Sequence, residues 1–181
     1  MATIPTPYVF VAGVKMAATA LTAGITAALS WCLTDYPRCR VWQSTNLSMP
    51  SATVTLVTWD SESYDNDTMH STSSNTSRLV ATTSGLYEIF INLQFPNATY
   101  TQMDLMARKN AAGSSSGGTA ITRSGAAMNF QTSRVPQLSF KMFLAAGEYV
   151  EYWATQTGAG AGTLIGGEFS CYAEMTWVAT S

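Results

Sequence analysis

Charged side chains are scarce in this sequence, since Asp, Glu, Lys and Arg make up 11% of its 181 residues. Soluble proteins usually carry about a quarter, and here Ser, Thr, Asn, Gln and Gly take their place. A surface solvated by neutral hydrogen-bonding groups is typical of fibres, shells and secreted β-proteins rather than of cytosolic enzymes. The net charge of -2 creates no field that attracts nucleic acid or an anionic membrane, so we expect neither as a partner.

Catalytic side chains are also few. The one histidine, His70, stands in a Ser/Thr-rich connection, and no Gly-x-Ser-x-Gly motif accompanies it. The sequence has no P-loop, no dinucleotide-binding glycine pattern and no Cys or His pair at zinc spacing. We therefore expect a protein that is not an enzyme and has no cofactor, in which His70 is structural or exposed.

Cysteine is too rare for a disulfide framework. The three cysteines, Cys32, Cys39 and Cys171, are odd in number and widely spaced. Cys32 and Cys39 could form a pair, but buried free thiols are the favoured interpretation.

Long hydrophobic runs are missing as well. Residues 16–33 have nearly the length of a membrane-spanning helix. The run consists mostly of Ala and Thr and contains Gly24, so its free energy of transfer into lipid is weak. It also lacks the basic segment with which a signal peptide begins, and we predict no membrane insertion.

Alternating apolar residues, by contrast, are abundant, and the clearest case is residues 85–95. Its period of two places five large apolar side chains on one face: Tyr87, Ile89, Ile91, Leu93 and Phe95. Similar alternation recurs at 103–108, 138–144, 149–153 and 169–177. We expect a first strand that includes Val41 and Gln43-Ser44-Thr45, and a polar connection after Trp59. About eight to ten short strands, with turn signals every 8–12 residues or so, are typical of an all-β sandwich or jelly roll. We expect residues 85–95 to be a central strand of this sandwich.

The first 40 residues follow a different pattern. Pro5 and Pro7 favour an extended arm, and its apolar side chains, which include Tyr8 and Phe10, must bury themselves on another surface. Residues 17–33 are predicted to form a helix, with apolar positions at spacings of three and four. These positions are Ala18, Leu21, Ile25, Ala28 and Cys32. The pattern fits a helix packed on its own domain and a short bundle of identical helices equally well.

Two segments are candidates for ligand contacts. The acidic residues Asp60, Glu62, Asp65 and Asp67 have oxygen ligands at alternating positions and are weak candidates for Ca²⁺, although a solvated turn is the favoured interpretation. We interpret residues 110–136 as a long loop, and loops of this length are often functional. Its candidate contact residues are Arg123, Asn129, Phe130 and Arg134.

Residues 40–180 resemble the C1q/TNF-like family of jelly-roll domains. The resemblance rests on Gly85-Leu86-Tyr87 at the start of the central strand, on Ser77-Arg78-Leu79 before it and on residues 144–150. In that last run Gly147-Glu148 stands where the family has Gly-Asp. An aromatic, apolar final strand at 169–178 completes the order. The resemblance implies a C1q/TNF-like jelly-roll β-sandwich that forms a homotrimer.

Residues 1–39 are similar to the N-terminal attachment segment of small structural proteins of tailed bacteriophages, particularly those of actinobacterial hosts. The shared features are a Met-Ala-x-Ile-Pro-x-Pro start, a glycine before a Thr/Ala-rich helix, Trp31-Cys32-Leu33 and Pro37-Arg38-Cys39. Thr22, where this segment often has Asn, and Gly24 in mid-helix depart from the pattern.

Together the two resemblances imply a virion protein made in the host cytoplasm. Residues 1–39 would attach the trimer to other virion proteins, and residues 40–181 would form its head. We expect a minor tail or tail-fibre protein whose head contacts the host surface, where a glycan is a possible partner; the alternative is a capsid decoration or head-fibre protein that stabilises the phage head. The residues expected to attach and trimerise are Tyr8, Phe10, Leu21, Ile25, Leu29 and Trp31.

Overall fold

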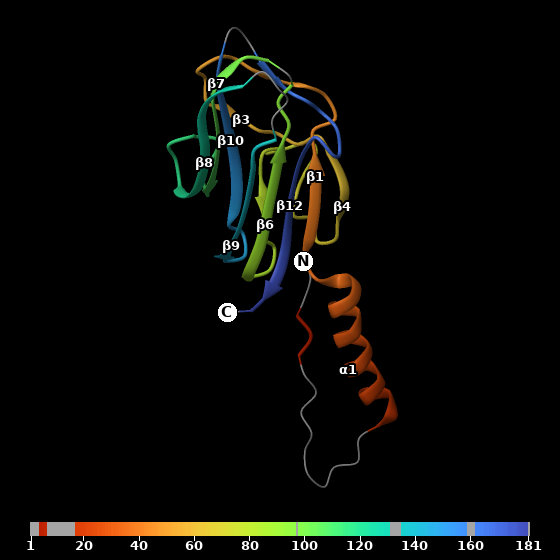
Figure 1. Ribbon diagram of the computed structural model, residues 1–181. Helices are drawn as coiled ribbons and strands as arrows, with labels where there is room; N and C mark the ends of the chain where they lie inside the picture. The colour runs from red at the N-terminus through yellow and green to blue at the C-terminus, as the bar shows by residue number, and fades with distance from the viewer. Residues whose placement is uncertain (1–3, 7–16, 97, 131–134, 159–161, 181) are drawn as a thin grey trace.

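The chain folds into two antiparallel β-sheets that pack face to face, with one helix projecting beyond the end of the sandwich at which strand β1 begins (Figure 1). The structure is a computed structural model, and it describes residues 4–6, 17–96, 98–130, 135–158 and 162–180. Strands dominate and there is a single short α-helix in the described residues. The predicted all-β sandwich with an N-terminal helix is therefore confirmed.

The first sheet has five strands in the order β4-β1-β12-β6-β9. Their bounds are β4 Ser61–Asp65, β1 Arg38–Trp42, β12 Cys171–Ala179, β6 Gly85–Leu93 and β9 Gln137–Leu144. Every neighbouring pair is antiparallel. Strands from both ends of the chain thus meet in one sheet, because β1 pairs along its length with β12.

The second sheet has the order β3-β10-β7-β8, and β5 also pairs with β10. Its strands are β3 Thr55–Leu56, β10 Tyr149–Gly158, β7 Tyr100–Lys109, β8 Thr119–Phe130 and β5 Leu79–Val80. A short separate ladder joins β2 (Leu47–Met49) to β11 (Gly162–Leu164). Side chains of both large sheets form one apolar core.

Strand β6 is the interior strand that its alternation predicted. It lies between β12 and β9, and its side chains Tyr87, Ile89, Ile91 and Leu93 are fully buried. Complete burial of an apolar side chain of this size stabilises a fold by about 1.5–3 kcal/mol. Gly85 begins the strand because a Cβ there would overlap the indole of Trp177.

The N-terminal helix α1 spans Ala18–Ser30, inside the predicted range 17–33. A π-helical turn, Trp31–Asp35, follows it and leads into β1. In the described part of the chain, no helix combines the length and the hydropathy that a membrane crossing requires. Cys39 and Cys171 are free and buried, as expected; burial raises the pKa of both thiols, that of Cys171 to about 12. The side chain of Cys32 lies outside the described residues.

Three predictions about local structure are wrong. Residues 119–130 are not part of a long loop but form β8, which pairs along β7. As an edge strand of small and polar residues, exposed or half-buried from 119 to 125, β8 lacks the apolar alternation that marks a strand. The polar connection after Trp59 contains β4, another edge strand. The first strand ends at Trp42, whereas we placed Gln43-Ser44-Thr45 within it.

Candidate functional site

The first candidate surface is the outer face of the first sheet, which is turned away from the core. Residues directly opposite one another on paired strands share a face. The register therefore aligns one row across all five strands: Tyr64, Arg40, Glu174, Phe90 and Ser139. We call these five residues the central row. None of them is fully buried, so the row lies at the surface of the single chain.

The guanidinium group of Arg40 contacts several side chains on this face. Its guanidinium carbon lies 4.1 Å from the centroid of the Tyr172 ring and 6.0 Å from that of Phe169. Its Nη1 donates to the Glu174 carboxylate at 2.5 Å, and its Nη2 donates to the backbone carbonyl of Glu168 at 3.1 Å. Stacking and two hydrogen bonds to different acceptors fix this cation in one geometry, so covering it would cost little side-chain entropy.

Two further rows flank the central one. On one side Arg38, Thr176, Glu88 and Lys141 face one another across the strands; on the other side Trp42, Tyr172, Asn92 and Gln137 do so. Within the second of these rows, Gln137 donates to the Asn92 side-chain oxygen at 2.7 Å. The face is therefore a mixture of aromatic rings, amides and paired charges. Of these, aromatic residues and arginine are enriched in the cores of protein interfaces.

Large apolar side chains stand exposed at the margins of this face. Phe143, at the end of β9, is 46% exposed, and Phe169, beside Arg40, is 81% exposed. Phe90 contacts Tyr172 with ring centroids 5.7 Å apart, and both are only half-buried. Single exposed apolar residues are ordinary, but several rings on one sheet face mark an interaction site. We call the three rows together with Phe143 and Phe169 the assembly face.

Helix α1 adds an apolar stripe that no described residue covers. None of its residues is buried, and its larger side chains are 39% exposed at Leu21, 52% at Ile25 and 54% at Leu29. Their spacing of four puts all three on one side of the helix. A helix of 13 residues is marginal in water without tertiary contacts. The interpretation that this helix packs on its own domain is therefore not what the structure shows.

Trp31 attaches the base of the helix to the head. It is buried, and its ring meets that of Trp177 edge-on at 5.4 Å between centroids. Together with Tyr36 and Val178, these rings line a groove of about 390 Å³. Trp31 thus differs from the other predicted attachment residues of α1, since it already has a partner within the chain. Tyr8 and Phe10 lie outside the described residues.

The four acidic residues that were weak candidates for Ca²⁺ form hydrogen bonds with different partners. Asp65 accepts backbone N–H groups of Asp67, Met69 and His70 at 2.9–3.2 Å. Asp67 accepts from the Thr82 hydroxyl. In the described residues no cluster of Asp, Glu, His or Cys has the arrangement of a metal site. These carboxylates organise the β4–β5 connection instead of converging on one point.

Asp60 lies apart from the others in this group. Partial burial opposes its ionisation, but hydrogen bonds from Ser44 and Ser61 outweigh that effect and lower the pKa of the carboxyl below its usual value. Ser44 donates through both its backbone N–H and its hydroxyl, each at 2.7 Å. Asp60 therefore fixes the loop after β1.

Glu62 pairs with His70, whose Nδ1 lies 2.7 Å from the carboxylate; its Nε2 lies 3.2 Å from the Thr76 carbonyl oxygen. His70 is 5% exposed. Both ring nitrogens therefore have structural partners inside the protein.

The candidate contact residues of the 110–136 segment fall on or after β8. Arg123 forms an ion pair with Asp104 at 3.0 Å and is 62% exposed. The side chains of Asn129 and Phe130, and all of Arg134, lie outside the described residues. The expectation that they form one loop surface is thus replaced by an exposed edge strand in which Arg123 is already paired.

The residues of the assembly face that sequence reasoning missed are mainly Arg40, Glu174 and Tyr172. Arg40 and Glu174 are 134 positions apart, and no local pattern links them. The second face of residues 85–95, with Phe90 on it, was the only signal.

No protein-family model and no curated protein sequence matches this chain. Solved structures do match its fold. The Eiger TNF protein of S. frugiperda superposes with a TM-score of 0.62 at 11% identity, covering 81% of this chain and 95% of that one. Murine APRIL gives 0.60 at 9% identity, covering 79% and 99%. The globular domain of the zebrafish complement 1qA protein gives 0.54 at 11%, covering 80% and 99%. The chain therefore has a C1q/TNF-like jelly-roll fold, and at these identities the likeness concerns the fold alone.

Proposed function

We propose that this protein is a non-enzymatic structural protein of a phage virion, assembled as a homotrimer. Three copies would join through the assembly face and through α1, and the β-heads would be displayed outward as a minor tail or tail-fibre protein. The observation that carries the proposal is an apolar helix stripe with no buried residue, in the same chain as a sheet face rich in aromatic residues.

The fold supports self-association. Proteins with the TNF and C1q jelly roll typically form homotrimers. Arg40 and Glu174 are already paired on the assembly face, so covering them does not leave an uncompensated charge. Burial of Phe90, Tyr172 and Phe143 would supply the hydrophobic part of the contact.

The helix supports the same arrangement. Identical α1 helices that pack through Leu21, Ile25 and Leu29 would bury the stripe that one chain leaves in solvent. The helix lies beyond the end of the sandwich at which β1 begins, clear of the two sheets (Figure 1). This position leaves room for a short bundle that links the heads to other virion proteins.

The displayed heads would contact the host surface. A trimer offers three equivalent contact sites, so that weak binding at one site becomes effective through multivalency. The virion location and the host contact rest on the resemblance of residues 1–39 to phage attachment segments.

The first test is the mass of the full-length chain in solution, measured by native mass spectrometry and light scattering at micromolar concentration. We expect a trimer, and a monomer would contradict the proposal. Imaging of labelled protein on intact virions is expected to place it at the tail; a signal spread over the head would favour capsid decoration instead. The isolated trimer is expected to compete with infection, and its failure to do so would also favour decoration.

A further inference from the structure

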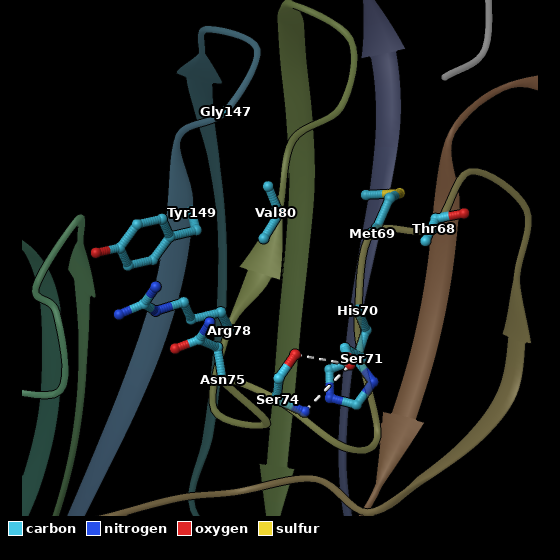
Figure 2. Close-up of a pocket in the computed structure, with 10 residues that line it drawn as sticks. All are labelled: Thr68, Met69, His70, Ser71, Ser74, Asn75, Arg78, Val80, Gly147 and Tyr149. Atoms are coloured by element: carbon cyan, nitrogen blue, oxygen red, sulfur yellow. Dashed lines mark hydrogen bonds between the residues drawn. The ribbon is translucent and has the colours of Figure 1, made fainter.

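A pocket with a mixed polar and apolar wall lies on the side of the head. Figure 2 shows it between the connection that joins β4 to β5, strand β5 itself and the start of β10. Its volume is about 320 Å³, at the lower end of the range for small-ligand sites. None of the residues that line it belongs to the assembly face.

Arg78 is the best-fixed polar group of this pocket. Its Nε donates to the Glu151 carboxylate at 3.2 Å, and its guanidinium carbon lies 4.3 Å from the centroid of the Tyr149 ring. Figure 2 shows the guanidinium directly beside that ring. The stacking and the ion pair hold the group in place, while its two terminal nitrogens have no hydrogen-bond partner among the described residues. They therefore present a planar pair of donors.

The positive charge of Arg78 is balanced by the buried carboxylate of Glu151. Glu151 is 1% exposed and also accepts hydrogen bonds from the Ser77 hydroxyl at 2.8 Å and the Gly113 N–H at 3.0 Å. Nearby, β4 carries Glu62 and Asp65 and the connection after it carries Asp67; none of these acidic residues belongs to the pocket wall. No excess positive charge remains to attract an anion, so the site favours a neutral ligand.

Asn75 supplies the complementary polar group. Its backbone is left-handed, with a φ of 49°, and its side chain is exposed. No described residue bonds to its amide, which offers both donors and acceptors. The hydroxyls of Ser71 and Ser74 lie on the same wall, 3.3 Å from each other. A ligand with several adjacent hydroxyl groups can pair with all of these.

One apolar residue and one histidine complete the wall. Val80, which is half-buried, provides apolar surface in the middle of the pocket, as Figure 2 shows. His70 also lines it, but its side chain is fully buried and both of its ring nitrogens face structural partners, so it offers no free base to a ligand. A pocket with these features lacks a nucleophile–base pair and fits binding rather than catalysis.

From these observations we infer that the pocket binds one neutral sugar residue, with Arg78 and Asn75 bonding to neighbouring hydroxyl groups. A hexose carries both the hydroxyls that such a planar donor pair recognises and the C–H surface that Val80 can contact. The inference stands apart from the virion proposal, because all the residues involved belong to one head.

The test is a titration of the full-length protein with methyl glycosides of glucose, galactose, mannose and N-acetylglucosamine, followed by saturation-transfer NMR and calorimetry. Their blocked anomeric carbon mimics a sugar at the end of a glycan, and the free sugars are titrated in parallel to separate the two sources. At least one glycoside is expected to bind with a dissociation constant on the order of 1 mM, which is usual for a ligand this small.

Two variants locate the binding. Arg78→Lys keeps the charge but loses the planar pair of donors. Asn75→Gly removes the amide and tolerates the left-handed backbone. Each is expected to weaken binding at least fivefold, whereas Arg123→Lys, on β8, leaves it unchanged. Melting temperatures confirm that the variants remain folded.

Three outcomes would overturn the inference. They are the absence of any signal from the wild-type protein, binding that both pocket variants retain in full, and tighter binding of methyl glucuronide than of the neutral glycosides. The last result would make the site an anion site. Trimer mass is measured on the same samples, so loss of sugar binding and loss of assembly are recorded separately.

Discussion

The head buries its large apolar side chains, whereas helix α1 leaves its own exposed. In β6, Tyr87, Ile89 and Ile91 are fully buried by the chain's own sheets. In α1, no residue is buried, and Ile25 is 52% exposed. The head therefore contains the interactions that stabilise it, whereas the helix has apolar surface but no core. The difference indicates that the described residues do not supply the contacts that would stabilise the helix; the proposed assembly would supply them.

The largest effect is expected in the core of the head. Ile89→Ala removes a fully buried side chain from the middle of β6 and leaves a cavity. We expect the free energy of unfolding to fall by about 2–5 kcal/mol. Denaturant titration followed by tryptophan fluorescence measures the change.

The adjacent residue provides the matched control. Glu88 lies on the opposite face of the same strand and is 53% exposed in the single chain. Measured on the dissociated single chain, Glu88→Ala should change the free energy of unfolding by at most about 0.5 kcal/mol. Equal losses for the two variants would mean that β6 is not packed on one face only, and the contrast between head and helix would fail.

A smaller effect, on assembly alone, is expected in the helix. Ile25→Lys places a charge on the apolar stripe, where partner helices would bury it without a counter-ion. We expect the dissociation constant of the trimer to rise tenfold to a hundredfold, which corresponds to about 1.4–2.7 kcal/mol. Sedimentation equilibrium measures it, and the unfolding of the head should remain unchanged.

Ala27→Lys is the control for this variant. Two residues apart on a helix correspond to about 200° of rotation, so residue 27 points away from the stripe. It is equally exposed in the single chain. If both lysine variants weaken assembly alike, the stripe is not the contact surface, and α1 has another role.

The same contrast explains what could be predicted from the sequence. The alternation of β6 reports burial on one face of the sheet, which is a local property, and it predicted the strand and its core residues. Strand β8 escaped prediction because an edge strand with Ser124 and Gly125 in mid-run need not alternate. A Cβ at Gly125 would meet the Asp104 carboxylate, which would have to shift to make room for it.

The assembly face could not be predicted, because its key contacts cross the sheet. The ion pair of Arg40 with Glu174 depends on the register of β1 against β12. No spacing within either strand reveals that register. In the same way, the helix pattern predicted an apolar stripe but not whether the chain itself would cover it. The acidic residues Asp60 and Asp65 looked like one group in the sequence, yet they bond to different partners.

The smallest effect concerns pH and also separates the two regions. Helix α1 contains no ionisable side chain, so pH should act on the head alone. In the turn between β9 and β10, a hydrogen bond from Lys109 at 2.7 Å, together with the Ala145 N–H, lowers the pKa of the Glu148 carboxyl. A carboxyl whose pKa is lower in the folded state stabilises the fold above its ordinary value and loses this contribution as the pH falls through the folded value.

Glu148→Gln should therefore lower the free energy of unfolding at pH 7 by at most about 1 kcal/mol, because the ion pair is partly exposed. The difference between the variant and the wild type should shrink as the pH falls below the ordinary glutamate value of 4.5. Denaturant titrations of both proteins between pH 7 and about pH 3 measure it. A difference that stays constant over this range would mean that the charge of Glu148 does not stabilise the turn. The dissociation constant of the trimer should be the same for both proteins at neutral pH, since Glu148 belongs neither to the assembly face nor to the helix stripe.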